Sequence, residues 1–340
     1  MGERDIIQSL DEKSRETGVN SQPIVRDYLM GIAASASNQV FQGEARSADD
    51  VPVIIGGIAL RKGYFINFPR YTTDIDYSTR RDFFERRSET EDQYYEARVR
   101  DIGALTRDRV NSVYGSTAMP LDPIVYDVER RHIRDVGQLG ALRAHLRFPK
   151  IFKYQDIRMK FETNVTRQKD EMTSPQEVPV LHAYPDANEL KLETIIVEDV
   201  RKIHSDKVSA FLRRLSESSN MVKTSRMKDI FDIWYISQVY PNDMLEKLFS
   251  ADLQKQKNEG RNTSELQRVM DMVKDDSDRF LQWLVELVKL NVKGLDHKGD
   301  DEIIRRMVLG LIPRYHFPSA KVLVENLAFE VSRIKIGNTA

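Results

Sequence analysis

The sequence predicts an α+β protein: a mixed β-sheet flanked by helices, followed by an α-helical domain. Two patterns along the 340 residues support this prediction. Up to about residue 195, short β-branched or alternating segments lie between helical ones, whereas beyond about residue 200 apolar residues recur every three to four positions. We therefore expect a first domain, with two N-terminal helices, at residues 1–195 and a helical domain at residues 196–340.

The composition is that of a globular protein with a core. Hydrophobic residues make up 40% and charged residues 31%. No apolar stretch approaches the roughly 20 residues that a membrane-spanning helix requires, and the N-terminus carries no apolar run of the signal-peptide type. The chain has no cysteine, which excludes disulfides, zinc–thiolate sites and cysteine nucleophiles. We expect a cytoplasmic location and no membrane partner.

The elements of the first domain follow one another in order. Residues 1–40 favour two helices. Residues 51–55 are β-branched and stop at Gly56-Gly57, as expected of a buried strand that ends in a glycine turn. Residues 74–77 alternate between polar and apolar, which indicates a strand with one buried face. Further predictions are a helix over 89–112, β-structure over 123–129, a hairpin over 148–164 that turns near 154–156, and a strand over 190–198.

Apolar residues in the second domain form stripes at helical spacing, which is typical of the core of a helical bundle. One pair of stripes ends near Gly294, and another stripe stops at Pro313. The stripe residues are Leu266, Val269, Met270, Val273, Phe280, Trp283, Leu284, Leu287 and Val288, then Ile303, Ile304, Met307, Val308 and Leu311, then Leu323, Val324, Leu327, Ala328 and Val331.

The glycine pair is the first feature that points to chemistry. Gly56 and Gly57 let the backbone approach a ligand closely, and the helix that starts there offers N–H groups to a phosphate. An ordinary tight turn is the alternative interpretation.

A pair of aspartates is the second feature. Asp74 and Asp76 are two residues apart, so in a strand both side chains point to one face while Ile75 turns to the core. Neighbouring carboxylates repel each other unless a cation lies between them, and hard oxygen ligands suit Mg²⁺ that also holds phosphates. Glu162, on another alternating strand, is the candidate third ligand of a two-metal site. Solvated aspartates at a strand end are the alternative.

Four motifs in order resemble those of one protein family. Val53-Ile-Ile-Gly-Gly-Ile-Ala-Leu and Arg70-Tyr-Thr-Thr-Asp74-Ile-Asp76 resemble the glycine-pair and Asp-x-Asp signature of the AbiEii nucleotidyltransferases. Lys207-Val-Ser-Ala-Phe-Leu and Lys228-Asp229-Ile-Phe-Asp232-Ile resemble the later motifs of that family. The family provides the toxin of bacterial type IV abortive-infection systems. The resemblance covers about residues 53–235 and implies a polymerase-β-like nucleotidyltransferase fold.

The resemblance also assigns roles in the first domain. Gly56 and Gly57 would hold the triphosphate of a nucleoside triphosphate, and Arg70 and Thr73 are further candidates for nucleotide binding. The two aspartates of the Asp-x-Asp motif would bind magnesium as the cofactor.

In the helical domain the resemblance implies that Lys207 contacts phosphate and that Asp229 is essential, so that this domain contributes both to the cleft. Lys228 stands where the family has arginine, and Arg226 is the candidate substitute for the nucleotide contact. The alternatives are a Lys207 that extends to water and an Asp229 that pairs with Arg226.

These inferences predict a magnesium-dependent nucleotidyltransferase. The resemblance implies that the acceptor is the 3′ end of tRNA and that a separate antitoxin protein relieves the growth arrest. The arginine-rich stretch between residues 61 and 147 would contact RNA phosphates, or would be a solvated, salt-bridged surface. Two alternatives remain: a nucleotidyltransferase that modifies a protein or a small molecule, and a non-catalytic module that binds a nucleotide.

Overall fold

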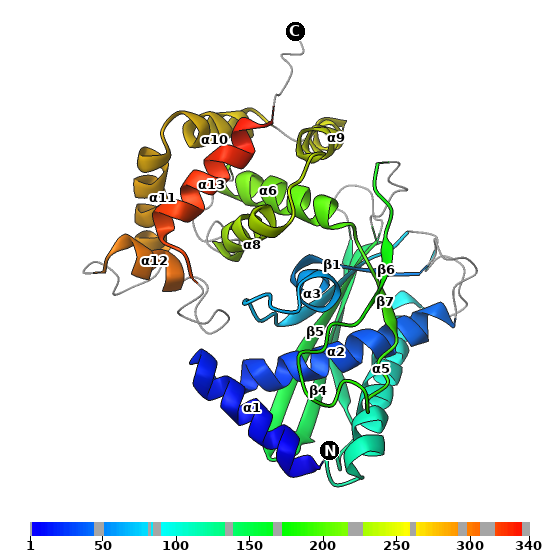
Figure 1. Ribbon diagram of the computed structural model, residues 1–340. Helices are drawn as coiled ribbons and strands as arrows, with labels where there is room; N and C mark the ends of the chain where they lie inside the picture. The colour runs from blue at the N-terminus through cyan, green and yellow to red at the C-terminus, as the bar shows by residue number, and fades with distance from the viewer. Residues whose placement is uncertain are drawn as a thin grey trace. The chain divides into compact units, whose positions relative to one another are not determined.

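The computed structural model describes residues 2–43, 51–80, 83, 90–132, 139–165, 172–216, 227–258, 263–291, 298–306 and 317–334. The chain divides into two compact units, Met1–Glu198 and Asp199–Ala340 (Figure 1). The first unit combines a sheet with helices and the second is helical, so the predicted fold class is confirmed. Within these described ranges, no helix is both long and apolar enough to cross a membrane.

The described strands form one mixed sheet in the order β3-β4-β5-β2-β1-β7-β6. The pairs β1–β7 and β2–β5 are parallel, and the remaining neighbours are antiparallel. The strand β2 therefore lies inside the sheet, between β1 and β5. The strands are β1 (Val53–Ile55), β2 (Asp74–Ser78), β3 (Ile124–His132), β4 (Leu139–Ile151), β5 (Tyr154–Asn164), β6 (Gln176–Pro179) and β7 (Thr194–Val197).

Three long helices accompany this sheet: α1 (Glu3–Thr17), α2 (Ser21–Gln42) and α5 (Glu91–Tyr114). The helix α5 packs on β3 and β4, and α2 packs on β5 and β7 (Figure 1). A Cβ at Gly103 of α5 would lie only 2.9 Å from Cδ1 of Leu146, so the two elements approach closely. Leu146 and its alternate neighbours on β4 are buried, whereas the residues between them are only partly buried. The face opposite α5 is consequently the polar face of the sheet.

The hairpin β4–β5 differs from the prediction in two respects. Its turn lies at Phe152 and Lys153, not near residues 154–156, and its first strand begins at Leu139. Phe152 has a φ of 51° and is buried, and its N–H donates to the carbonyl of Ala118 at 2.7 Å. A contact with a distant segment thus fixes the turn. The last predicted strand is shorter than expected, and the short strand β6 was not predicted.

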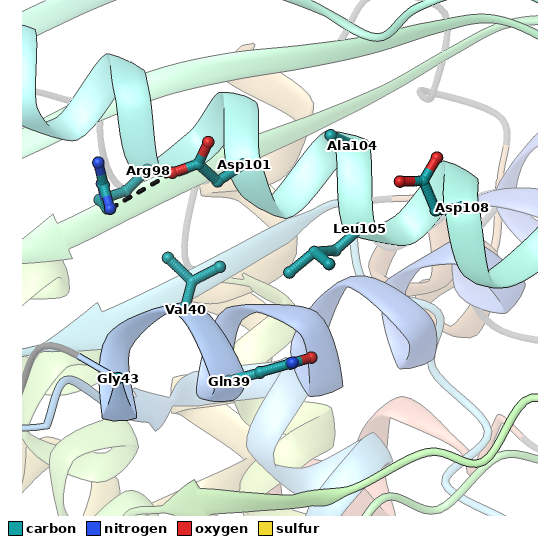
Figure 2. Close-up of a pocket in the computed structure, with 8 residues that line it drawn as sticks. All are labelled: Gln39, Val40, Gly43, Arg98, Asp101, Ala104, Leu105 and Asp108. Atoms are coloured by element: carbon teal, nitrogen blue, oxygen red, sulfur yellow. Dashed lines mark ion pairs between the residues drawn. The ribbon is translucent and has the colours of Figure 1, made fainter.

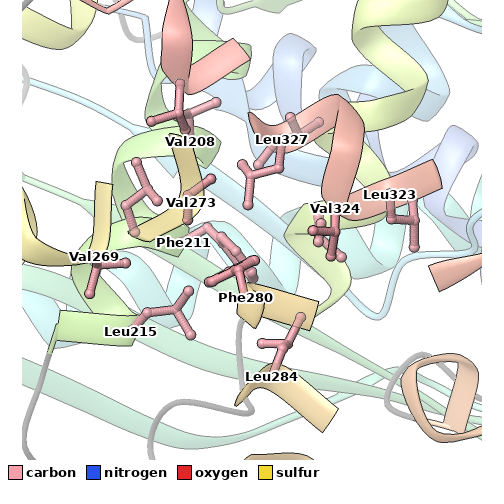
Figure 3. Packing of buried hydrophobic residues seen from close by; sticks show 14 of the residues in the cluster. Val208, Phe211, Leu215, Val269, Val273, Phe280, Leu284, Leu323, Val324 and Leu327 are labelled. Carbon is pink, nitrogen blue, oxygen red and sulfur yellow. The ribbon is translucent and has the colours of Figure 1, made fainter. Parts of the chain in front are cut away.

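The second unit consists of α6 (Val200–Ser216), α8 (Met227–Val239), α9 (Leu245–Asn258), α10 (Ser264–Asp275), α11 (Ser277–Asn291), α12 (Asp300–Arg306) and α13 (Ala320–Ser332). Its core brings together Phe211 of α6, Val273 of α10, Phe280 of α11 and Leu327 of α13 (Figure 3). The predicted stripes lie in or against this core wherever the structure describes them. Met307, Val308 and Leu311 lie outside the described residues.

A buried charged cluster joins three segments of the first unit. Asp27 of α2 is fully buried, and both of its carboxylate oxygens accept hydrogen bonds from Arg61, which also donates to the carbonyl of Phe68. Lys62 Nζ lies 3.1 Å from the same carboxylate, and the hydroxyl of Tyr184 donates to it at 2.9 Å. Burial would raise the pKa of Asp27, but the two cations hold that pKa well below its ordinary value.

The cluster predicts a pH dependence of stability that Lys62 controls. Burial lowers the pKa of Lys62 from 10.5 to about 8, although Asp27 opposes this shift. Between these values the unfolded chain binds more protons than the folded chain, so stability rises with pH. From about pH 7.5 to about pH 9.5 the free energy of unfolding should gain about 2 kcal/mol relative to Lys62→Met, measured by urea denaturation. Equal pH dependence in the two proteins would contradict this prediction.

Candidate active site

A glycine turn connects β1 to the segment that follows it. Gly56 has a φ of 71°, in the left-handed region that favours glycine, and it begins the short helix α3 (Gly56–Ala59). Ile55 is paired in register with Asp76 on β2, and a Cβ at Gly56 would lie 3.6 Å from Asp76 Oδ2. The turn therefore lies directly beside the second aspartate.

The second glycine makes room for an arginine. A Cβ at Gly57 would lie 2.5 Å from Nη2 of Arg70, whose side chain is almost completely buried. A side chain at this position would therefore require the buried guanidinium group to move. The structure thus brings together Gly56, Gly57 and Arg70, while Thr73 is exposed immediately before β2.

The two aspartates share the polar face of the sheet, as the alternation predicts. Because β2 and β5 are parallel, Asp74 is paired with Lys160 and Asp76 with Glu162. Lys160 Nζ lies 3.1 Å from Asp74 Oδ2, 3.9 Å from Asp76 Oδ1 and 3.5 Å from Glu162 Oε2. Burial would lower the pKa of Lys160, but the three carboxylates raise it above its ordinary value.

Glu162 is held by an arginine of the next strand. Arg143 on β4 donates from Nε at 2.9 Å and from Nη2 at 2.7 Å to Oε2 of Glu162. Burial would raise the pKa of Glu162, yet these hydrogen bonds and the charge of Lys160 lower it. The carboxylate is therefore ionised and fixed in position at neutral pH.

The sequence prediction missed three residues that support the carboxylates. Lys160 and Arg143 are two of them. Thr72 is buried, and its hydroxyl donates to Asp74 Oδ1 at 3.1 Å. Thr72 stands two positions before Asp74, and in an extended chain this spacing places both side chains on one face. The spacing could therefore have predicted the contact between them from the sequence.

A hard cation fits the donor set that Asp74 and Asp76 provide. Both carboxylates are partly exposed, at 15% and 28%, and carboxylate oxygens are the ligands that Mg²⁺ prefers. Their contact with an ammonium group shows that this face accommodates positive charge. Among the residues that the structure describes, however, no group of three or more histidine, aspartate or glutamate side chains is placed to hold a metal ion.

The second unit brings its two predicted residues together. Lys207 Nζ of α6 lies 3.0 Å from Oδ1 of Asp229 and 2.6 Å from Oδ2 of Asp232, both on α8. Both carboxylates are completely buried, and Lys207 is only 9% exposed. The two aspartates are one helical turn apart and fix the direction of the lysine. Arg226 lies outside the described residues.

A groove between α2 and α5 is a separate feature of the first unit (Figure 2). Val40 and Leu105 face each other across it, and Arg98 pairs with Asp101 at 3.3 Å on its rim. None of the predicted site residues lines this groove. It is therefore not the place where the carboxylates of β2 act.

Comparison with known proteins identifies the family. The model of the family described as nucleotidyl transferase AbiEii toxin of type IV toxin–antitoxin systems matches residues 44–290, which is more than half of the chain. The chain belongs to this AbiEii family. The resemblance of the four motifs is thereby confirmed, and the protein is a nucleotidyltransferase toxin of the type IV class. Membership implies a nucleoside triphosphate substrate and an antitoxin partner.

Solved structures show similarity over nearly the whole chain. JHP933 from Helicobacter pylori is 15% identical, with 92% of this chain and 95% of that chain covered and a TM-score of 0.43. MenT4, a nucleotidyltransferase toxin from Mycobacterium tuberculosis H37Rv, is 13% identical, with 93% and 85% covered and a TM-score of 0.46. A search of curated proteins finds no match.

Two glycines with positive φ allow a matched test of the AbiEii glycine turn. Gly18 (φ 65°) has no atom within 4 Å of a Cβ position, whereas Gly56 (φ 71°) lies beside Asp76. Each replacement by alanine should cost about 1 kcal/mol of unfolding free energy through backbone strain. Only Gly56→Ala should also lower the nucleotidyl transfer rate, by at least about tenfold, because it displaces the turn. A similar rate loss in Gly18→Ala would refute a role specific to Gly56.

Proposed function

We propose that this AbiEii toxin uses Mg²⁺, held by Asp74 and Asp76, to transfer a nucleotidyl group from a nucleoside triphosphate to the 3′ end of tRNA in the cytoplasm. The observation that best supports this proposal is the pair of carboxylates on one face of β2, beside the glycine turn. The metal, when bound, would lower the pKa of the acceptor hydroxyl and neutralise charge that develops on the α-phosphate.

The residues of the chain provide position and charge for this reaction. The N–H groups at Gly56 and Gly57 bind the triphosphate, with Arg70 behind the turn and Thr73 at the start of β2. The acceptor oxygen forms a bond to the α-phosphorus while the bond to the bridging oxygen breaks. Pyrophosphate leaves and the hydroxyl proton passes to solvent. Positioning of the reactants accounts for much of the rate in this class of reaction.

We further propose that Lys207 binds substrate phosphate and that Asp229 positions it. The support is the four-motif match together with the 3.0 Å contact between the two side chains. Asp232 shares this positioning function, since its carboxylate lies still closer to the ammonium group. A nucleotide contact by Arg226 is proposed from the sequence alone.

The polar face of the sheet supports a single-stranded RNA end as the acceptor. Tyr126 of β3 stacks on His145 of β4, with centroids 5.2 Å apart and planes 23° apart. His145 is paired in register with Lys160, so this stack lies next to the carboxylate cluster. Arg147 and Arg158, which both pair with Asp156, lie on the same face, two residues from His145 and Lys160 along their strands. Aromatic rings beside cationic side chains are typical of surfaces that bind unpaired nucleotides.

A labelling experiment tests this function. Purified protein is incubated with Mg²⁺, total tRNA and each of four α-labelled nucleoside triphosphates. We expect label on tRNA from the wild type and none above background from Asp74→Asn/Asp76→Asn, because the variant lacks both ligand charges. The matched control is Asp101→Asn/Asp108→Asn, which removes two carboxylates from the groove between α2 and α5 and should retain transfer.

The other outcomes separate the alternatives. Label on protein, or on an added small molecule, would replace tRNA as the acceptor. Nucleotide binding without any labelled product would favour a module that binds without turnover. Thermal unfolding of each variant establishes that the chain is folded before its activity is compared.

A further inference from the structure

We infer that Lys160 supplies the charge of the second cation in this site, so that the enzyme works with one divalent ion and not two. The inference rests on the proposed function, in which Asp74 and Asp76 hold the metal. Two-metal sites place their ions about 3.5–4 Å apart and use carboxylates of neighbouring strands to hold both. The carboxylates that would bind the second ion are already in contact with Lys160 and Arg143.

The position of Lys160 is the first argument. Its ammonium lies within 4 Å of all three carboxylates, at 3.1 Å from Asp74, 3.5 Å from Glu162 and 3.9 Å from Asp76. The parallel register of β2 and β5 places Lys160 directly beside Asp74, and its side chain is 27% exposed. The lysine therefore provides a positive charge that is fixed by the sheet and does not dissociate from the protein.

The state of Glu162 is the second argument. Both hydrogen bonds from Arg143 go to Oε2, the oxygen that Lys160 also contacts. Arg143 lies in addition 3.5 Å from Glu129 on β3. A second divalent ion bound through Oε2 would have to displace a guanidinium and an ammonium from that oxygen, and charge-assisted hydrogen bonds of this kind are strong.

The remaining ligands suit a single ion. Asp74 and Asp76, which also contact Lys160, are the two carboxylates of the proposed metal site, and Mg²⁺ is commonly bound by one or two carboxylates with substrate phosphates and water. One divalent ion offsets these two charges. Lys160 then adds a further positive charge for the triphosphate, the contribution that a second ion makes elsewhere.

The test counts metal ions directly. Mn²⁺ bound per chain is measured by electron paramagnetic resonance, with and without a non-hydrolysable nucleotide analogue, for the wild type, Lys160→Met and Lys160→Arg. Lys153→Met is the matched control, because Lys153 pairs with Asp11 at the end of the hairpin, away from the carboxylates. Unfolding curves confirm that each variant is folded.

We expect one Mn²⁺ per wild-type chain in the nucleotide complex. Without nucleotide, Lys160→Met should bind Mn²⁺ at least about tenfold more tightly, because the ammonium no longer repels the ion, yet its transfer rate at saturating metal should fall at least about tenfold. Lys160→Arg should keep the wild-type stoichiometry, and Lys153→Met should match the wild type in both measurements.

Two Mn²⁺ ions per wild-type chain would overturn the inference while leaving the proposed metal site intact. An unchanged Mn²⁺ affinity in Lys160→Met would overturn it as well, since the ammonium would then not compete for the carboxylates. If the wild type binds no Mn²⁺ in the absence of nucleotide, the proposed metal site itself fails, and the inference with it.

Discussion

The buried carboxylate of Asp27 is the constraint on which the geometry of the candidate site depends. It lies on α2 and accepts hydrogen bonds from Arg61, so it fixes the chain just beyond the glycine turn against the helix layer. Through Arg61 it also holds the carbonyl of Phe68, two residues before Arg70. The irregular stretch between β1 and β2 is thereby attached at both ends. Removal of one partner from a buried ion cluster is strongly destabilising, so this attachment depends on each of its members.

Charge compensation organises the polar face in a similar way. Three carboxylates on β2 and β5 repel one another, and Lys160 of β5 and Arg143 of β4 compensate their charge. All of these side chains occupy alternate positions of their strands, so the pleat itself brings them to one face. The opposite face remains apolar and packs on α2 and α5. The fold thus separates an apolar core from a charged surface within a single sheet.

Local patterns in the sequence predicted the parts of the site that depend on local spacing. The alternation of Asp74, Ile75 and Asp76 placed both carboxylates on one face, and the glycine pair marked the end of a buried strand. Lys160 was missed because its contact with Asp74 depends on the parallel pairing of strands some 80 residues apart, which periodicity does not report. The hairpin turn was misplaced because Ala118, a distant residue, fixes Phe152. The helical core, by contrast, follows directly from its 3.6-residue stripes.

The length of the wide turn η2 (Leu60–Tyr64) determines where its two cationic side chains point. It closes with a bond from the N–H of Phe65 to the carbonyl of Leu60, five residues back, and it carries both Arg61 and Lys62 to one carboxylate. Consecutive residues of an α-helix point about 100° apart, so loss of a single residue here would turn one cation away. The number of residues in this turn is therefore as necessary to the Asp27 cluster as the two charges themselves.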